Sequence, residues 1–242
     1  MKVNERKNIL LISGLDPSGQ AGVIVDIETV FNLRCNPLAA IATNTVQNKN
    51  KVTAGHAIDS MILHEQLSHL IKAHPIHAVK IGLLVQKESA HIIKTLFEEM
   101  HVPIIFDPVY QSSTGYYFTS EKEFNAIAHE LSSIVTLITP NKLEAEALSK
   151  IIINEEIDFQ KAAQEIGYKN ILIKGGHFTR KNNDFFYSRG KAAWIEGSER
   201  QFILGQRGAG CRLSTAIACF SAEDESLEHA IKHSKAYLES VI

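Results

Sequence analysis

The sequence has few cysteines, little net charge and no long uninterrupted apolar stretch. Its three cysteines, Cys35, Cys211 and Cys219, lack the spacing of a metal site. A small and odd number of cysteines favours free thiols in a reducing compartment. A formal net charge of −2 gives no electrostatic reason to expect nucleic acid or an anionic membrane as a partner. The first apolar run is too short for a signal-peptide core, and no stretch approaches a membrane span. We therefore expect a cytoplasmic protein.

No linker, low-complexity tract or repeat divides the chain, so we expect a single domain over residues 1–242. Short β-rich runs alternate with amphipathic helical stretches throughout the sequence. This alternation predicts an α/β fold, in which a mostly parallel sheet is covered by helices on both faces. Residues 184–203 alternate like one or two antiparallel strands and should lie on the edge of that sheet.

The predicted elements follow from apolar runs and from helical periodicity. Strands are predicted over Asn8–Gly14, Pro37–Asn48, His77–Leu84, Val102–Val109, Val135–Pro140 and Lys169–Gly176. Helices are predicted over Ala21–Cys35, Ser60–Ala73, Glu88–Met100, Ser120–Ile134, Lys142–Ile151, Phe159–Ile166, Cys211–Ala222 and Leu227–Val241. In such folds ligands bind at the carboxyl ends of the strands. The segments after the strands are mostly polar or glycine-rich, which suits one shared cleft.

The segment GLDPSGQAGVIVD, residues 14–26, follows the first predicted strand. Its glycines are not spaced as in a dinucleotide fingerprint, and it lacks the Lys-Ser/Thr pair of a P-loop. An ordinary turn explains Asp-Pro-Ser-Gly well, because Asp and Pro favour turn initiation. Asp26 is harder to explain structurally, since it interrupts the apolar face of the predicted helix.

Two segments permit both a structural and a functional interpretation. Asn141 and Glu144 have the spacing of a capping box, worth about 1 kcal/mol of helix stability. The same carboxylate, at a helix start beside the cleft, could instead hold Mg²⁺ through water. The segment KGGH, from Lys174 to His177, ends a strand with two glycines, so its backbone can approach a ligand or simply turn.

The segment Gly208–Ala209–Gly210, here called the anion loop, leads directly into an apolar helix that begins near Cys211. Unpaired backbone N–H groups at a helix N-terminus bind anions, and the same dipole favours a thiolate, so the pKa of Cys211 is expected below its ordinary value. An anion site with a base at its edge is what phosphoryl transfer to an alcohol needs. A small buried apolar role suits Cys35 and Cys219 better than Cys211.

The ordered set of segments SGLDPSGQAGVIVD, TVQN, KIGLL, DPV, TPNKLEAEAL, IKGGH and GAGC resembles the hydroxymethylpyrimidine/phosphomethylpyrimidine kinases of thiamine biosynthesis, in the ribokinase-like superfamily. The resemblance runs through nearly the whole chain. It implies a three-layer α/β/α sandwich with a small antiparallel edge, use of ATP and Mg²⁺, and an aminopyrimidine alcohol as substrate. It also allows a homodimer, which is common among relatives.

The resemblance implies roles for individual residues. Asp26 and Gln47 would contact the aminopyrimidine, in a pocket lined by Gly14, Leu83 and Val109. The anion loop would stabilise the transferred phosphoryl group, and Cys211 would be the catalytic base. Nucleotide phosphates and Mg²⁺ would be handled by Asp107, Asn141 and Glu144, and we also assign Lys174 to the nucleotide.

The chain departs from the family pattern at two positions. Ala209 replaces the threonine of the usual Gly-Thr-Gly-Cys, and Ser113 stands where the family has a lysine after Asp-Pro-Val. A hydroxyl and a positive charge near the phosphates are thereby lost. We hypothesise that Arg207 and Arg212, which flank the anion loop, partly replace this charge, because arginine is a good bidentate phosphate ligand.

The sequence thus predicts ATP-dependent phosphorylation of 4-amino-5-hydroxymethyl-2-methylpyrimidine, its monophosphate or both. One alternative is a kinase for another vitamin-like alcohol such as pyridoxal. From a different class, the departures permit a degenerate relative that binds a pyrimidine without transferring phosphate. A nucleotide-dependent redox domain is disfavoured by the missing dinucleotide fingerprint.

Overall fold

The computed structural model describes residues 6–175, 183–197, 207–223 and 225–241. His177, at the end of the KGGH segment, and the last part of the predicted edge region lie outside the described residues. None of the helices in the described ranges combines the length and the apolar character needed to cross a membrane.

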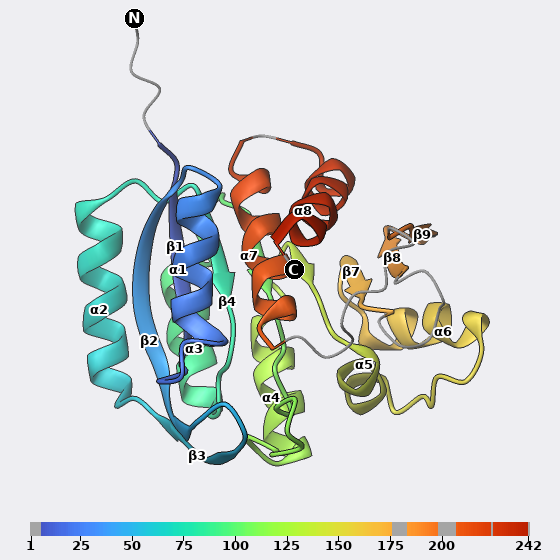
Figure 1. Ribbon diagram of the computed structural model, residues 1–242, viewed down its shortest axis with the longest axis horizontal. Coiled ribbons are helices and arrows are strands. Elements are labelled where there is room, and N and C mark those ends of the chain that lie inside the picture. The colour runs from blue at the N-terminus through green and yellow to red at the C-terminus, as the bar shows by residue number, and fades with distance from the viewer. Residues whose placement is uncertain (1–5, 176–182, 198–206, 224, 242) are drawn as a thin grey trace, which may run out of the picture.

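Within these ranges the strands form one sheet in the order β3-β2-β1-β4-β5-β6-β7-β8-β9 (Figure 1). The strands are β1 Asn8–Leu15, β2 Asn36–Gln47, β3 Val52–Ala57, β4 Ala78–Ile81, β5 Ile104–Phe106, β6 Leu137–Ile138, β7 Asn170–Ile173, β8 Asp184–Ser188 and β9 Lys191–Ile195. The six strands β2, β1, β4, β5, β6 and β7, in sheet order, run parallel to one another, whereas β3 pairs antiparallel with β2 at one edge and β8 and β9 pair antiparallel at the other.

The predicted antiparallel edge is confirmed by β8 and β9, but the sheet has a second antiparallel edge that the sequence did not predict. Strand β3 returns along β2 after a turn in which the Asn48 amide donates to the Lys51 carbonyl at 3.0 Å. Its sequence VTAGHA is short, and a single residue in it, Val52, is buried. So weak an apolar pattern does not distinguish a strand from a loop.

Helices cover both faces of the sheet, which confirms the predicted three-layer α/β/α sandwich (Figure 1). On β1, Leu10 and Ile12 pack in one core and Ile9 and Leu11 in the other, as the two-residue period of a strand requires. The first core lies under α2 Ser60–Ala73, α3 Lys87–Phe97, α4 Glu121–Leu131, α5 Lys142–Ser149 and α6 Glu156–Ile166. The second lies under α1 Gly22–Asn32, α7 Ala209–Ser221 and α8 Leu227–Val241.

The strand order reverses direction at β1. From β1 the chain moves outward to β2 and β3, and it then returns to β4 on the opposite side of β1. Loops leave such a switch point in opposite directions, so a crevice opens at the carboxyl ends of these strands. The fold therefore places the segments after β1, β2 and β4 around one hollow.

Candidate active site

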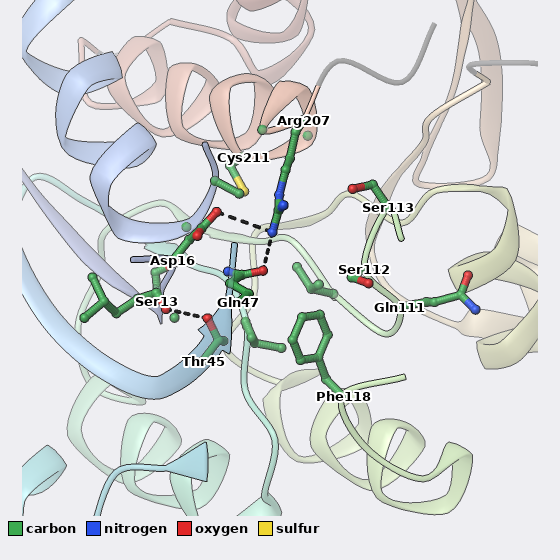
Figure 2. A pocket seen from close by; sticks show the side chains of 18 of the residues that line it. Ser13, Asp16, Thr45, Gln47, Gln111, Ser112, Ser113, Phe118, Arg207 and Cys211 are labelled. Carbon is green, nitrogen blue, oxygen red and sulfur yellow. Dashed lines mark hydrogen bonds and ion pairs between the residues drawn. The ribbon is translucent and has the colours of Figure 1, made fainter. Parts of the chain in front are cut away.

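A cavity of about 240 Å³ lies at this switch point, beside the start of α7 (Figure 2). Four of the five predicted substrate-binding residues line it, together with the whole anion loop and Cys211: these are Gly14, Gln47, Leu83 and Val109. The segment after β5 completes the wall with Gln111, Ser112, Ser113 and Phe118. Segments from residue 14 to residue 211 thus meet around one space, as the sequence predicted.

The anion loop depends on a glycine at its first position. Gly208 has a φ of +84°, in the left-handed region that favours glycine. A Cβ atom there would lie 2.4 Å from the Gln20 carbonyl oxygen, so no other residue fits without moving backbone. Gly208 is also the N-cap of α7 and supplies no side-chain cap. The first-turn amides of α7 consequently have no side chain of the N-cap residue over them.

Cys211 lines the cavity together with the anion loop, and its side chain points from α7 toward the other labelled side chains (Figure 2). The predicted depression of its pKa is wrong. Burial raises the pKa of the Cys211 thiol to about 11, although the Lys80 ammonium and a hydrogen bond from the Gly22 backbone act in the opposite direction. Nearby carboxylates add to the rise, so desolvation and negative charge outweigh the groups that favour the thiolate. Cys35 and Cys219 are buried free thiols, as predicted.

Asp26 lies beside the cavity but not on its surface, so the expected contact with the substrate ring is not supported by its position. It is fully buried on α1, where its Oδ2 atom lies 2.7 Å from Lys80 Nζ. Its Oδ1 atom accepts a hydrogen bond from Thr215 Oγ1 at 2.8 Å. Both carboxylate oxygens are therefore engaged within the protein, and Asp26 serves to hold Lys80.

Lys80 is the principal residue that the sequence-based interpretation missed. It lies on β4, is fully buried and lines the cavity together with Cys211. Burial by itself lowers the pKa of an ammonium group, but Asp26 and other nearby anions outweigh this and raise the pKa of Lys80. A lysine within the apolar run HAVKIGLL was the available signal, because it matches the equally unexpected Asp26.

The two arginines that flank the anion loop have different environments. Arg207 lines the cavity, and its Nη2 atom donates to Gln47 Oε1 and lies 3.5 Å from Asp16 Oδ2 (Figure 2). Arg212 instead pairs with Glu28 on α1, with Nη1 2.9 Å from Oε2. The structure thus does not bring Arg212 to the cavity, because its side chain leaves α7 toward α1.

The other residues predicted to handle nucleotide and metal form a buried cluster next to the anion loop. Lys174 Nζ lies 2.7 Å from Asp107 Oδ1, and a Cβ atom on Gly210 would lie 3.3 Å from the same ammonium nitrogen. The capping box at the start of α5 is present, with the Glu144 amide donating to Asn141 Oδ1 at 2.9 Å and the Asn141 amide to Glu144 Oε2 at 2.7 Å.

The two carboxylates of this cluster titrate differently. Burial raises the pKa of Asp107, but Lys174 and Lys80 more than offset this and hold it below its ordinary value. Burial raises the pKa of Glu144 to about 7, and Lys174 only partly compensates. Because Lys80 is also paired with Asp26, the two ammonium groups do not neutralise all the buried carboxylates, and the cluster retains an affinity for a further proton or cation.

Comparison with known proteins identifies the family. A family model described as phosphomethylpyrimidine kinase matches residues 16–242. The chain belongs to the phosphomethylpyrimidine kinase family. It is 35% identical over 240 residues to a hydroxymethylpyrimidine/phosphomethylpyrimidine kinase of Aquifex aeolicus, covering 96% of this chain and 93% of that one.

Solved structures of the same fold support this membership. A phosphomethylpyrimidine kinase of Clostridium difficile superimposes with a TM-score of 0.83 at 27% identity, over 97% of this chain and 99% of that one. A pyridoxal kinase of Staphylococcus aureus, solved with pyridoxal, gives a TM-score of 0.86 at 25% identity, over 98% and 88% of the two chains. The ribokinase-like fold implied by the sequence is thus confirmed.

Within this phosphomethylpyrimidine kinase fold, the predicted residues divide into two neighbouring groups. Gly14, Gln47, Leu83, Val109, Gly208, Ala209, Gly210 and Cys211 line the cavity. The second group, Asp107, Asn141, Glu144 and Lys174, adjoins the anion loop without lining the cavity. Ser113, which stands in place of the family lysine, faces the cavity and brings no charge to it.

Proposed function

We propose that this protein transfers the terminal phosphoryl group of ATP to 4-amino-5-hydroxymethyl-2-methylpyrimidine, its monophosphate or both. The observation that carries the proposal is the position of Cys211, at the edge of a cavity formed on one side by the anion loop and on another by Gln47. Family membership supports the reaction class, because the curated relatives are named as kinases of this substrate.

The cavity suits a single small heterocycle. Its volume of about 240 Å³ is below the roughly 300–1,000 Å³ typical of sites for drug-sized ligands. Leu83 and Val109 give it apolar walls, against which the faces of a pyrimidine ring can pack. Gln47 offers an amide, which both donates and accepts hydrogen bonds and can therefore orient a ring edge.

The chemistry proposed for this site is proton removal next to charge stabilisation. The Lys80 ammonium favours the thiolate form of Cys211, and this thiolate takes the proton of the substrate hydroxyl while the phosphoryl group is transferred, which leaves Cys211 as a neutral thiol. The first-turn amides of α7 stabilise the negative charge on the transferred group. Because a pKa of about 11 leaves Cys211 largely protonated near neutral pH, only its thiolate fraction acts as the base, and the loose transition state of phosphoryl transfer lets the hydroxyl proton leave late.

The buried cluster beside the anion loop fits the nucleotide side of this reaction. Mg²⁺ in kinases is usually held by one or two carboxylates together with phosphates and waters. Among the described residues no cluster of three or more potential ligands exists, but Asp107 and Glu144 supply two carboxylates with incomplete neutralisation. They would hold a nucleotide-bound Mg²⁺ ion, and the Lys174 ammonium, 2.7 Å from Asp107 Oδ1, would contact a phosphate oxygen. When bound, the metal neutralises charge on the phosphates.

An assay of ADP release with three acceptors tests the proposal: the aminopyrimidine alcohol, its monophosphate and pyridoxal. We expect turnover with one or both pyrimidines, and a fall of about 10²–10⁴-fold in Cys211→Ala. Cys219→Ala is the matched control, because this thiol lies on the same helix inside the core and should leave turnover nearly unchanged. Binding of the pyrimidine without any ADP release would instead identify a non-catalytic binding protein, and preference for pyridoxal a different vitamin kinase.

A further inference from the structure

Arg207 connects the anion loop to Gln47, the residue proposed to orient the substrate ring. Its guanidinium donates to the side-chain oxygen of Gln47, a residue 160 positions earlier in the chain (Figure 2). We propose that Arg207 fixes the orientation of the Gln47 amide and thereby determines which heterocycle edge the cavity accepts. This inference rests on the proposed function, because it specifies how the same cavity selects its pyrimidine.

The orientation follows from the chemistry of the two groups. A guanidinium carries only N–H donors, so it can face the Gln47 oxygen but not its NH₂ group. With Oε1 turned toward Arg207, Nε2 points the other way, and the described part of the chain gives it no hydrogen-bond partner. Flipping the amide would place NH₂ against the guanidinium and lose the hydrogen bond, which costs more in a partly buried site than in water.

Arg207 is itself held in place by two further groups. Its Nη1 atom donates to the Asn48 carbonyl oxygen at 2.8 Å, which ties the guanidinium to the backbone at the end of β2. Asp16 Oδ2, a buried oxygen with no hydrogen bond to any described residue, lies 3.5 Å from Nη2 and supplies the compensating charge. The other oxygen, Asp16 Oδ1, accepts from the amide and hydroxyl of Ser18 at 2.8 and 2.7 Å.

A locked amide selects one pattern of donors and acceptors on its ligand. With Nε2 as donor next to Oε1 as acceptor, Gln47 matches a ring nitrogen that accepts and an adjacent amine that donates, the edge of a 4-aminopyrimidine. The carbonyl oxygen has a second lone pair, so it can accept from Arg207 and from the ligand together. The 4-oxo analogue in its N–H form presents the reverse pattern, and Gln47 can match it only by flipping away from Arg207.

The test compares kcat/KM and Kd for the 4-amino compound with those for its 4-oxo analogue in the wild type and in Arg207→Met. The readout is the ratio of the kcat/KM values, and of the Kd values, for the two compounds, because effects on ATP binding or on folding act on both compounds alike. We expect the wild type to prefer the amine strongly and the ratio to fall at least roughly tenfold in Arg207→Met, since the amide becomes free to turn. Arg207→Lys, which keeps a donor, should retain most of the preference.

Arg212→Met is the matched control, because it removes the same charge from the same end of α7 but outside the cavity, and it should leave the ratio unchanged. Asp16→Asn, which removes the charge opposite Arg207, gives a second test should Arg207→Met not fold; its ratio should also fall. An unaltered ratio in a folded Arg207→Met variant that still binds the amine overturns this inference and leaves the proposed function intact. Failure of the wild type to bind either pyrimidine overturns both.

Discussion

Asp26 and Lys80 illustrate how single residues in apolar segments acquire meaning from each other. Each is fully buried, and their charged atoms lie 2.7 Å apart between α1 and β4. A buried ion pair adds little net stability over apolar residues, yet removal of one partner leaves an unpaired charge in the interior. Lys80 lines the cavity, so the contribution of the pair to the site is the positive charge that Asp26 holds in place near Cys211.

The Lys80–Asp26 pair leads to a prediction in which stability and reactivity separate. Lys80→Met should lower the free energy of unfolding by about 3–5 kcal/mol, because Asp26 loses its partner. The double variant Lys80→Met/Asp26→Leu should recover most of this loss, as measured by urea denaturation. In Lys80→Met the pKa of Cys211 rises further, since Lys80 is its main favourable charge, so alkylation of Cys211 at pH 8–9 should slow; the double variant also loses Asp26, which raises this pKa, and should slow less. Unchanged Cys211 alkylation in the folded Lys80→Met variant would contradict this role.

The start of helix α5 shows how one element can carry both a structural and a functional signal. Its capping box satisfies two backbone amides, and the same Asn141 and Glu144 lie beside Lys174 and the anion loop. The sequence left these two interpretations open, and the structure shows that they are compatible. The cap orients Glu144 by bonding its carboxylate to the Asn141 amide, so the helix start itself positions a group of the proposed metal site.

Helix caps at two positions allow the two roles of α5 to be distinguished. Asn141→Ala should cost about 1 kcal/mol of stability through loss of the side-chain cap, and it should also raise KM for ATP, because the start of α5 that carries Glu144 is no longer held by the Asn141 side chain. Ser120→Ala removes the equivalent N-cap of α4, where Ser120 Oγ accepts from the Glu123 amide, and lies outside the cavity. Ser120→Ala should lower the free energy of unfolding by a similar amount and leave the KM for ATP unchanged. A KM for ATP unaltered by Asn141→Ala means that the segment is a cap alone.

At the scale of the whole molecule, the cavity joins parts that are far apart in the chain. It lies where β1, β2 and β4 end and where α7, from the opposite face to α2–α6, begins. A ligand bound there contacts loops from several elements at once. Its binding energy therefore stabilises the folded sheet as a unit rather than one loop.

Ligand binding should thus raise the melting temperature of the whole protein. At a free concentration of the pyrimidine alcohol 100 times its Kd, the expected stabilisation is about 2.7 kcal/mol. For a chain of 242 residues this corresponds to a rise of roughly 5–10 °C, measured by calorimetry or by fluorescence of the single tryptophan, Trp194. Cys211→Ala should retain most of the shift, because it removes the base but not the walls of the cavity. Loss of the shift in that variant would make Cys211 a binding residue.

The layers, most strands and helices, and the gathering of post-strand segments into one site followed from the sequence. These depend on local periodicity and on where glycine and polar residues interrupt it, and helix α8 was predicted with its observed bounds, Leu227–Val241. The weakly patterned β3 escaped prediction because edge strands bury little. The anion loop with Cys211 was also correctly placed at the start of a helix beside the cleft.

Pairings between distant residues were decided only by the tertiary structure. Lys80 with Asp26, Arg207 with Gln47 and Arg212 with Glu28 depend on which helix faces which strand, which no local pattern records. The direction of the Cys211 pKa is of the same kind: the helix start favours a thiolate, but the cost of desolvation is set by everything packed around the sulfur. The sequence by itself determined the elements and the segments that gather at the cleft, whereas the packed structure determined the partners of the charged groups and their pKa values, because electrostatic energies depend on burial and on distance in space.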